Sequence, residues 1–308
     1  MTRESPVPDE VQRLLERYPT WPHRPRRATS SQVAHFARLV LEGATLTEVR
    51  SAARLEALVG LHPLAWDTDM LGVKTGRMTF VVPPDAACDR RETAREAVAA
   101  ARDKGYASLF TRVDASELDT VQALEAAGFE TVDAILSQYL WVSEAALPSS
   151  PIEVRSASRD DSALLGDLTD ATMAQSRFHS DPRVGAARAR SIYRQWGQNT
   201  VLGLNDLTLI CEVDGEPAGY LSAKDVKASR AAFGWGYCRI ELVAVLERFR
   251  GTGLVAAMTA RLIAECPSRR WDLCGIGTQI GNIRAMRAYA KVGFAPGDSI
   301  LTLRWRAS

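Results

Sequence analysis

The chain has 308 residues, 46% of them hydrophobic, and its 38 basic and 37 acidic residues leave a net charge of +1 at pH 7. This length predicts two domains, and the apolar fraction is large enough to give each a buried core. Because the charges balance, neither a general nucleic-acid partner nor a membrane surface is expected, since both would require a basic excess.

The cysteines and histidines show no pattern typical of a metal site or a disulfide framework. There are five cysteines and four histidines, without a C-x-x-C pair, so no metal is implied. Cys211 and Cys238 lie in strand-like runs and are predicted to be small core residues. No segment has the apolar stretch of a signal peptide or a membrane span, so the cytoplasm is the expected location.

Residues 1–57 are predicted to form a helical N-terminal extension. Helical spacing of apolar residues covers 31–41, with Ser30 as the N-cap, and covers 47–59 again. The basic cluster at 23–27 (HRPRR) is more typical of a solvated surface than of a nucleotide or RNA contact.

Residues 58–145 are predicted to form a domain of their own. Its expected elements are strands at 79–82, 107–113 and 134–142, with helices at 89–104 and 118–127. The segment ALEAAGF at 123–129 echoes AYAKVGF at 288–294, which suggests a duplication. The alternative is that a helix ending in Gly-Phe before a strand is merely a common connection.

The two copies differ at particular positions. Leu124 falls where the second copy has Tyr289, and Glu117 falls where it has Asn282. No Arg-Gly-x-Gly loop precedes the first copy. The N-terminal copy is therefore predicted to be a degenerate, non-catalytic unit.

A linker at 143–151, rich in Ser, Ala and Pro, precedes the last predicted domain, at 151–308. The expected elements there are strands at 152–156, 207–213, 217–226, 240–245, 271–278 and 300–305, with helices at 160–174, 187–198 and 254–264.

A glycine-punctuated loop, RGTG at 250–253, lies between the strand at 240–245 and the helix at 254–264. Backbone N–H groups at such a helix start bind a pyrophosphate without needing a particular side chain. The loop lacks the third glycine of the dinucleotide fingerprint and the lysine of a Walker A motif.

Two motifs carry a family resemblance. Arg250, Gly253 and Val255 stand in the marked places of R-x-x-G-x-[GA], although Val255 is larger than the expected residue. Residues 282–294 (NIRAMRAYAKVGF) match N-x-x-A-x-x-x-Y-x-x-x-G-F. Together they resemble the GNAT acetyltransferase superfamily, whose first motif is its acyl-CoA pyrophosphate loop. The resemblance implies an α/β (α+β) GNAT fold: a mixed central sheet flanked by helices, preceded here by the degenerate GNAT-like half and the helical extension.

The same resemblance implies a CoA-dependent N-acyltransferase with acetyl-CoA as cosubstrate, one CoA per chain and no metal. Tyr289 would protonate the departing CoA sulfur, since an ordinary phenol is protonated at neutral pH. Glu241 would deprotonate the amine, directly or through water, or would instead be a structural partner of Arg239 or Arg248. Alternation along the strand predicts that side chains 241, 243 and 245 share one face.

The resemblance implies contacts to two parts of CoA, the pantetheine arm and the pyrophosphate. The backbone at Val243, Ala244 and Val245 and the Asn282 side chain would bind the pantetheine arm. The phosphate loop and helix start would comprise Arg250, Gly251, Thr252, Gly253, Leu254 and Val255, with Ala285 nearby.

The acceptor is implied by a narrower resemblance. Residues 175–178, 193–196, 277–282 and 63–66 are similar to the TDP-4-amino-sugar (TDP-fucosamine) N-acetyltransferases. This implies a nucleotide-linked amino sugar or a related small metabolite. The implied acceptor-binding residues are Gln175, Arg177, Phe178 and Gln279, with His179 beside them. The N-terminal extension and Glu241 depart from these relatives.

Other functions stay open at this point. A GNAT-fold aminoacyl transferase that uses charged tRNA would show salt-dependent RNA binding. A non-catalytic acyl-CoA-binding protein would have no use for Tyr289 or Glu241. A homodimer is compatible with each of these functions.

Overall fold

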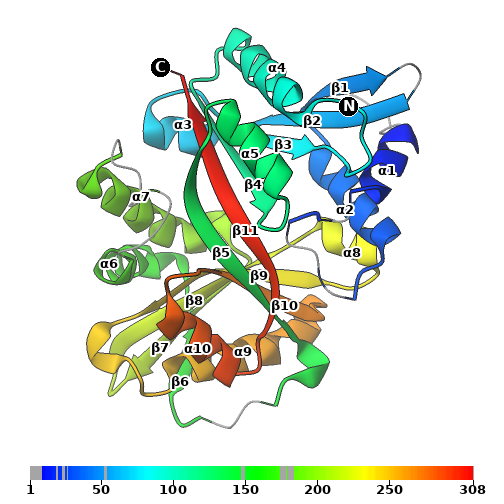
Figure 1. Cartoon of the computed structure of the whole chain (residues 1–308). Coiled ribbons are helices and arrows are strands. Elements are labelled where there is room, and N and C mark those ends of the chain that lie inside the picture. Colours follow the sequence, from blue (N-terminus) through cyan, green and yellow to red (C-terminus); the bar gives the residue numbers. More distant parts are fainter. Residues whose placement is uncertain are drawn as a thin grey trace, which may run out of the picture. The chain divides into compact units, whose positions relative to one another are not determined.

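The computed structural model describes residues 9–18, 20–22, 25, 27–51, 54–146, 150–173, 178 and 184–307. The chain divides into two compact units, each described below by itself (Figure 1). Unit 1 comprises residues 1–134 and 298–308, and unit 2 comprises residues 135–297.

Unit 1 contains a mixed sheet with the strand order β1-β2-β3-β4-β11. Its strands are β1 Thr45–Ser51, β2 Arg54–Pro63, β3 Thr75–Val81, β4 Ser108–Asp114 and the main part of β11 Ala295–Arg306. Its helices are α1 Asp9–Glu16, α2 Ser30–Leu41, α3 Ala65–Leu71, α4 Arg90–Asp103 and α5 Leu118–Ala126. The strands β3 and β4 are parallel, and helix α4 connects them.

In unit 2 the strands follow the order β5-β10-β9-β8-β7-β6, again with both parallel and antiparallel pairs. Its strands are β5 Glu130–Trp141, β6 Glu153–Ser156, β7 Leu207–Val213, β8 Glu216–Asp225, β9 Tyr237–Val245 and β10 Leu273–Gln279. Its α-helices are α6 Ser162–Thr172, α7 Ala186–Asn199, α8 Ala228–Phe233, α9 Leu254–Arg269 and α10 Ile283–Lys291. Short helical turns occur at Val142–Glu144, Arg159–Asp161, Thr200–Leu204 and Glu247–Phe249. A mixed sheet flanked by helices confirms the predicted fold class.

The two faces of the unit 2 sheet carry different helices. Leu221 of β8 lies in the buried cluster that contains α9 residues such as Leu254 and Leu262. The neighbouring Tyr220 points the other way, and its hydroxyl lies 2.6 Å from Thr169 Oγ1 of α6. Because adjacent residues of a strand face opposite sides, α9 and α6 cover opposite faces of the sheet.

In each unit, one strand pairs with a partner that is far away in the sequence. Residues Ile135–Trp141 of β5 pair antiparallel with Leu273–Gln279 of β10 in unit 2. Residues Ile300–Arg306 of β11 pair antiparallel with β4 in unit 1. Unit 1 is discontinuous in sequence because most of β11 belongs to it, whereas unit 2 is one continuous segment, and the predicted boundaries at 57 and at 145–151 stay predictions.

The prediction of a helix at 47–59 is wrong, because β1 and β2 form an antiparallel pair there. Residues 55–61 of β2 are all buried, including Glu56, so the strand lacks the alternation of apolar and polar residues that marks a half-exposed strand. The helical part of the predicted extension therefore ends at Leu41. The N-cap of α2 is also Thr29 rather than Ser30, since its hydroxyl accepts a bond from Gln32 N.

The exchanged strand β11 is part of the unit 1 core, where Leu303 and Trp305 pack with Leu109 and Leu124. We expect Trp305→Ala to lower the free energy of unfolding by about 3–5 kcal/mol, because it leaves a cavity under that sheet. Urea unfolding monitored by circular dichroism measures this loss. Leu118→Ala is the control, since Leu118 is 61% exposed and its truncation should cost under about 0.5 kcal/mol. Equal losses for the two variants would contradict the placement of β11.

In the part of the chain that the structure describes, no helix combines the length and hydrophobicity needed to cross a bilayer.

Candidate active site

The parallel strands β9 and β10 pair at their beginnings and then separate. Their register runs from Tyr237 opposite Leu273 to Ile240 opposite Ile276. Beyond that point β10 continues to pair with β5, and β9 continues to pair with β8. The edge of β9 that faces β10 is therefore available over Val243–Val245 for hydrogen bonds to an extended ligand, such as a pantetheine arm.

A β-bulge lies where the strands separate. The register between β8 and β9 shifts at Ser222/Ala223, which leaves Glu241 as the extra residue. Val243 and Val245 consequently pack against the cluster on the α9 side, which also contains Ile240. Glu241 lies with Arg239 on the opposite face, so the prediction that 241, 243 and 245 share a face is wrong. The inserted residue reverses the face toward which the following side chains of β9 point.

Glu241 is held by one arginine. Arg239 donates from Nε to Glu241 Oε1 at 2.7 Å, and its Nη2 lies 2.5 Å from the same oxygen. The Glu241 side chain is 12% exposed, and Oε2 takes no part in this ion pair. Arg248, the other predicted partner, pairs with Glu216 instead. The carboxylate therefore has one oxygen fixed and a second that can still accept a proton.

The glycine loop ends at the start of α9 as predicted. Gly251 and Gly253 have φ values of 86° and 92°, a left-handed region that side chains with a Cβ rarely adopt. The first bond of the helix runs from Ala257 N to Gly253 O at 3.0 Å, so the N–H groups of 251–256 precede it. These groups and the positive end of the α9 dipole have the chemistry that an anion site requires.

The side chains of this loop have internal partners. Arg250 Nη1 lies 3.4 Å from Glu247 Oε1, and the Thr252 hydroxyl donates to Phe249 O at 2.7 Å. The Thr252 hydroxyl hydrogen is thus engaged within the loop, which leaves its N–H for a phosphate. Leu254 is buried in the α9 core, and Val255 packs against that core, so the larger Val255 is accommodated.

Tyr289 lies in α10, within the same buried cluster as Ile240 and Ile276 where β9 and β10 separate. Its ring meets Phe294 edge-on at 6.0 Å. Burial raises the pKa of Tyr289 above its usual value near 10, so the phenol stays protonated at neutral pH. A buried, protonated hydroxyl can donate a proton to a developing thiolate.

Asn282 is the N-cap of α10, and its Oδ1 accepts a bond from Ala285 N at 3.2 Å. Its amide nitrogen and the second lone pair of Oδ1 remain for the predicted bond to pantetheine. Ala285 itself packs against the α9 core.

The predicted acceptor residues are only partly within the described structure. Gln175, Arg177 and His179 lie outside the described residues. Phe178 is 1% exposed and meets Tyr193 edge-on at 6.2 Å, so it is a buried residue. Gln279 is half-buried at the end of β10, paired with Ile135. No contact of Phe178 or Gln279 identifies an acceptor, and their role stays a prediction.

The corresponding helix of unit 1 begins differently. The Asp89 carboxylate caps α4 by accepting bonds from Arg91 N at 2.8 Å and Glu92 N at 3.3 Å. An acidic side chain there occupies the N–H groups and repels a phosphate. Leu124, at the place of Tyr289, is fully buried. Unit 1 therefore lacks both features of the unit 2 site, as the two sequence copies predict.

Two features of the site were missed by sequence reasoning. The bulge at Glu241 depends on the register with β8, which leaves no local signal in β9. The cluster of Cys238, Cys266 and Cys274 depends on the parallel pairing of β9 with β10, which brings residues far apart in sequence together. The prediction that Cys211 and Cys238 are core residues is confirmed, since both are fully buried.

Solved structures of known proteins share the fold described above. Solved structures that resemble the chain include a tandem GNAT protein from the clavulanic acid biosynthesis pathway, with a TM-score of 0.57, 17% identity and coverage of 99% of this chain and 97% of that one. A GCN5-related N-acetyltransferase from Sphaerobacter thermophilus gives a TM-score of 0.63, 13% identity and coverage of 98% and 94%.

A curated relative is the spore coat polysaccharide biosynthesis protein SpsD of Bacillus subtilis (strain 168), which is 26% identical over 139 residues. The match covers 45% of this chain and 45% of the relative, so it spans about half the length of that protein. Residues 172–294, which hold the loop, β9, β10 and Tyr289, match the model of the acetyltransferase (GNAT) family. The similarity to this family covers that segment of the chain.

Proposed function

We propose that the protein is an acyl-CoA-dependent N-acyltransferase that moves an acetyl group from acetyl-CoA to the amine of a small metabolite. The observation that carries the proposal is that unit 2 combines three features. These are the glycine loop at the start of α9, the open edge of β9, and Tyr289, which is buried in the core cluster that also contains Ile240 and Ile276. The loop suits the pyrophosphate, the strand edge suits the pantetheine arm, and Tyr289 suits the thioester sulfur.

The residues of unit 2 have different roles in the proposed reaction. The N–H groups of 251–256 bind the pyrophosphate, and the backbone at Val243–Val245 pairs with the pantetheine amides. The amine nitrogen forms a bond to the acyl carbon as the carbon–sulfur bond breaks, in one ternary complex without an acyl-enzyme. The amine proton passes to Glu241 Oε2 or to water, and Tyr289 gives its proton to the sulfur.

The acceptor we propose is an amino sugar, attached to a nucleotide. This rests on the motif resemblance to TDP-amino-sugar N-acetyltransferases and on the polysaccharide role that the name of SpsD gives to that relative. The protein would be incubated with acetyl-CoA and, separately, TDP-amino sugars, amino acids and simple amines, and free thiol would be measured. Thiol release with the amino sugars supports the proposal. Release only with another amine contradicts the acceptor, and CoA binding without release for any amine contradicts the enzyme.

The role of Glu241 as the base is tested by Glu241→Gln. We expect kcat to fall by about 10²-fold at neutral pH, because an amide cannot take up the amine proton. Glu212→Gln is the matched control, since Glu212 also pairs with an arginine, Arg155, on a strand of the same sheet. If Glu241→Gln keeps the kcat of the wild type and of the control, water is the base and Glu241 is only a structural partner of Arg239.

A further inference from the structure

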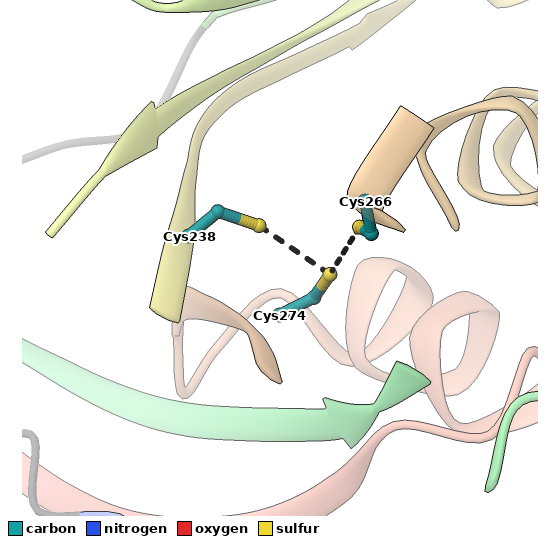
Figure 2. A group of neighbouring side chains, drawn as sticks. All are labelled: Cys238, Cys266 and Cys274. Carbon is teal, nitrogen blue, oxygen red and sulfur yellow. Dashed lines mark hydrogen bonds between the residues drawn. The ribbon is translucent and has the colours of Figure 1, made fainter. Parts of the chain in front are cut away.

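Three cysteines that are far apart in the sequence meet in the core of unit 2 (Figure 2). Cys238 comes from β9, Cys274 from β10 and Cys266 from the end of α9, and all three are fully buried. Cys238 and Cys274 are direct partners in the parallel register. Their sulfurs are 3.4 Å apart, and the sulfurs of Cys266 and Cys274 are 3.7 Å apart.

These distances fit a single metal ion bound by three sulfurs. All three Sγ atoms lie within 4.8 Å of one another. A metal at about 2.3 Å from each of three sulfurs in one plane would hold them about 4.0 Å apart. The sulfurs would therefore have to move by only a few tenths of an ångström to about 1 Å, without a change in the positions of the strands.

The donor set selects the kind of ion. It contains only sulfur, and among the described residues no fourth histidine, cysteine or carboxylate joins it. The core around it is mostly apolar and includes Leu262, Trp271 and Ile276. Arg269 and Asp272 lie near Cys266, whose thiol donates to Leu262 O at 3.2 Å. Zn²⁺ in structural sites takes four ligands, and Ca²⁺ or Mg²⁺ requires oxygen. Soft thiolates without other donors select Cu(I).

We propose that Cys238, Cys266 and Cys274 form a three-thiolate site for one Cu(I) ion. The ion displaces the thiol protons and joins β9, β10 and α9. Cys266 follows Gly253 by thirteen residues, so along the helix the site lies about 20 Å from the CoA loop. The site therefore stabilises β9, β10 and α9, the elements that carry the proposed CoA site.

The test is an anaerobic titration of the full-length, reduced protein with Cu(I), in competition with a chromophoric Cu(I) chelator. Each mixture is given time to equilibrate, because the sulfurs are buried. We expect one Cu(I) per chain and a rise in Tm of about 5 °C on saturation, since an ion that binds only the folded state stabilises it.

The variants Cys274→Ser and Cys266→Ser should each weaken Cu(I) binding by about 100-fold, because each leaves only two thiolates. Cys211→Ser is the matched control: Cys211 is a buried cysteine of the same core outside the cluster. It should bind Cu(I) like the wild type. Circular dichroism reports whether each variant folds, and Cys266→Ser replaces Cys274→Ser if the latter does not. No binding to the wild type, or equal binding by the cluster variants and the control, would overturn the proposal.

Discussion

Tyr289→Phe is expected to lower kcat by about 10²- to 10⁴-fold, because it removes the proton that the CoA sulfur needs as it leaves. The ring is retained, so its edge-on contact with Phe294 and the packing of the core around it should persist. The dissociation constant of acetyl-CoA should change little, since the lost interaction matters only as the thiolate forms. Steady-state kinetics and calorimetric titration measure the two quantities separately.

The pH profile gives a second readout for Tyr289. A general acid must be protonated, and burial raises the pKa of this phenol above its usual value. The wild-type kcat should therefore not fall through loss of this proton until the pH exceeds about 10. Tyr106→Phe is the control, since Tyr106 is also 7% exposed but belongs to unit 1. A Tyr289→Phe enzyme with the kcat of the control would remove Tyr289 from the acid role.

Gly253→Val is expected to weaken acetyl-CoA binding by about 10- to 100-fold. A β-branched residue at φ 92° is strained by about 1–3 kcal/mol, and the loop relieves the strain by moving its N–H groups away from the pyrophosphate. At saturating acetyl-CoA, kcat should be nearly unchanged, because the reacting atoms lie at the other end of the ligand. Calorimetric titration with acetyl-CoA measures the affinity.

The control for Gly253→Val is Gly215→Val. Gly215 lies in the turn between β7 and β8, with φ 76°, and a Cβ at either glycine would meet nothing within 4 Å. The two substitutions therefore impose a similar backbone strain, but only Gly253 belongs to the loop. If both variants bind acetyl-CoA equally well, the loop does not hold the pyrophosphate.

The sequence predicted the part of the fold in which local signals agree. The glycines at 251 and 253 separate an apolar strand from an amphipathic helix, so β9, the loop and the start of α9 could be placed closely. The predicted helix at 89–104 likewise agrees closely with α4, which the Asp89 carboxylate caps. These features depend on residues within one turn of each other.

The features that the sequence did not predict depend on partners distant in the chain. The buried strand β2 reads like a helix until β1 and β3 lie on either side of it. The bulge at Glu241 depends on the pairing register of β9 with β8. It places Glu241 on the same face as Arg239, with which Glu241 forms an ion pair. The exchange of β5 and β11 cannot be read from the order of elements, because each strand pairs outside its own half.

We propose that unit 2 alone holds an acyl-CoA site. A glycine loop begins α9 there, whereas a carboxylate cap begins the corresponding helix α4 of unit 1. Calorimetric titration of the intact protein with acetyl-CoA tests this directly through its stoichiometry. We predict one acetyl-CoA per chain, and binding of two molecules per chain or of none would contradict the account.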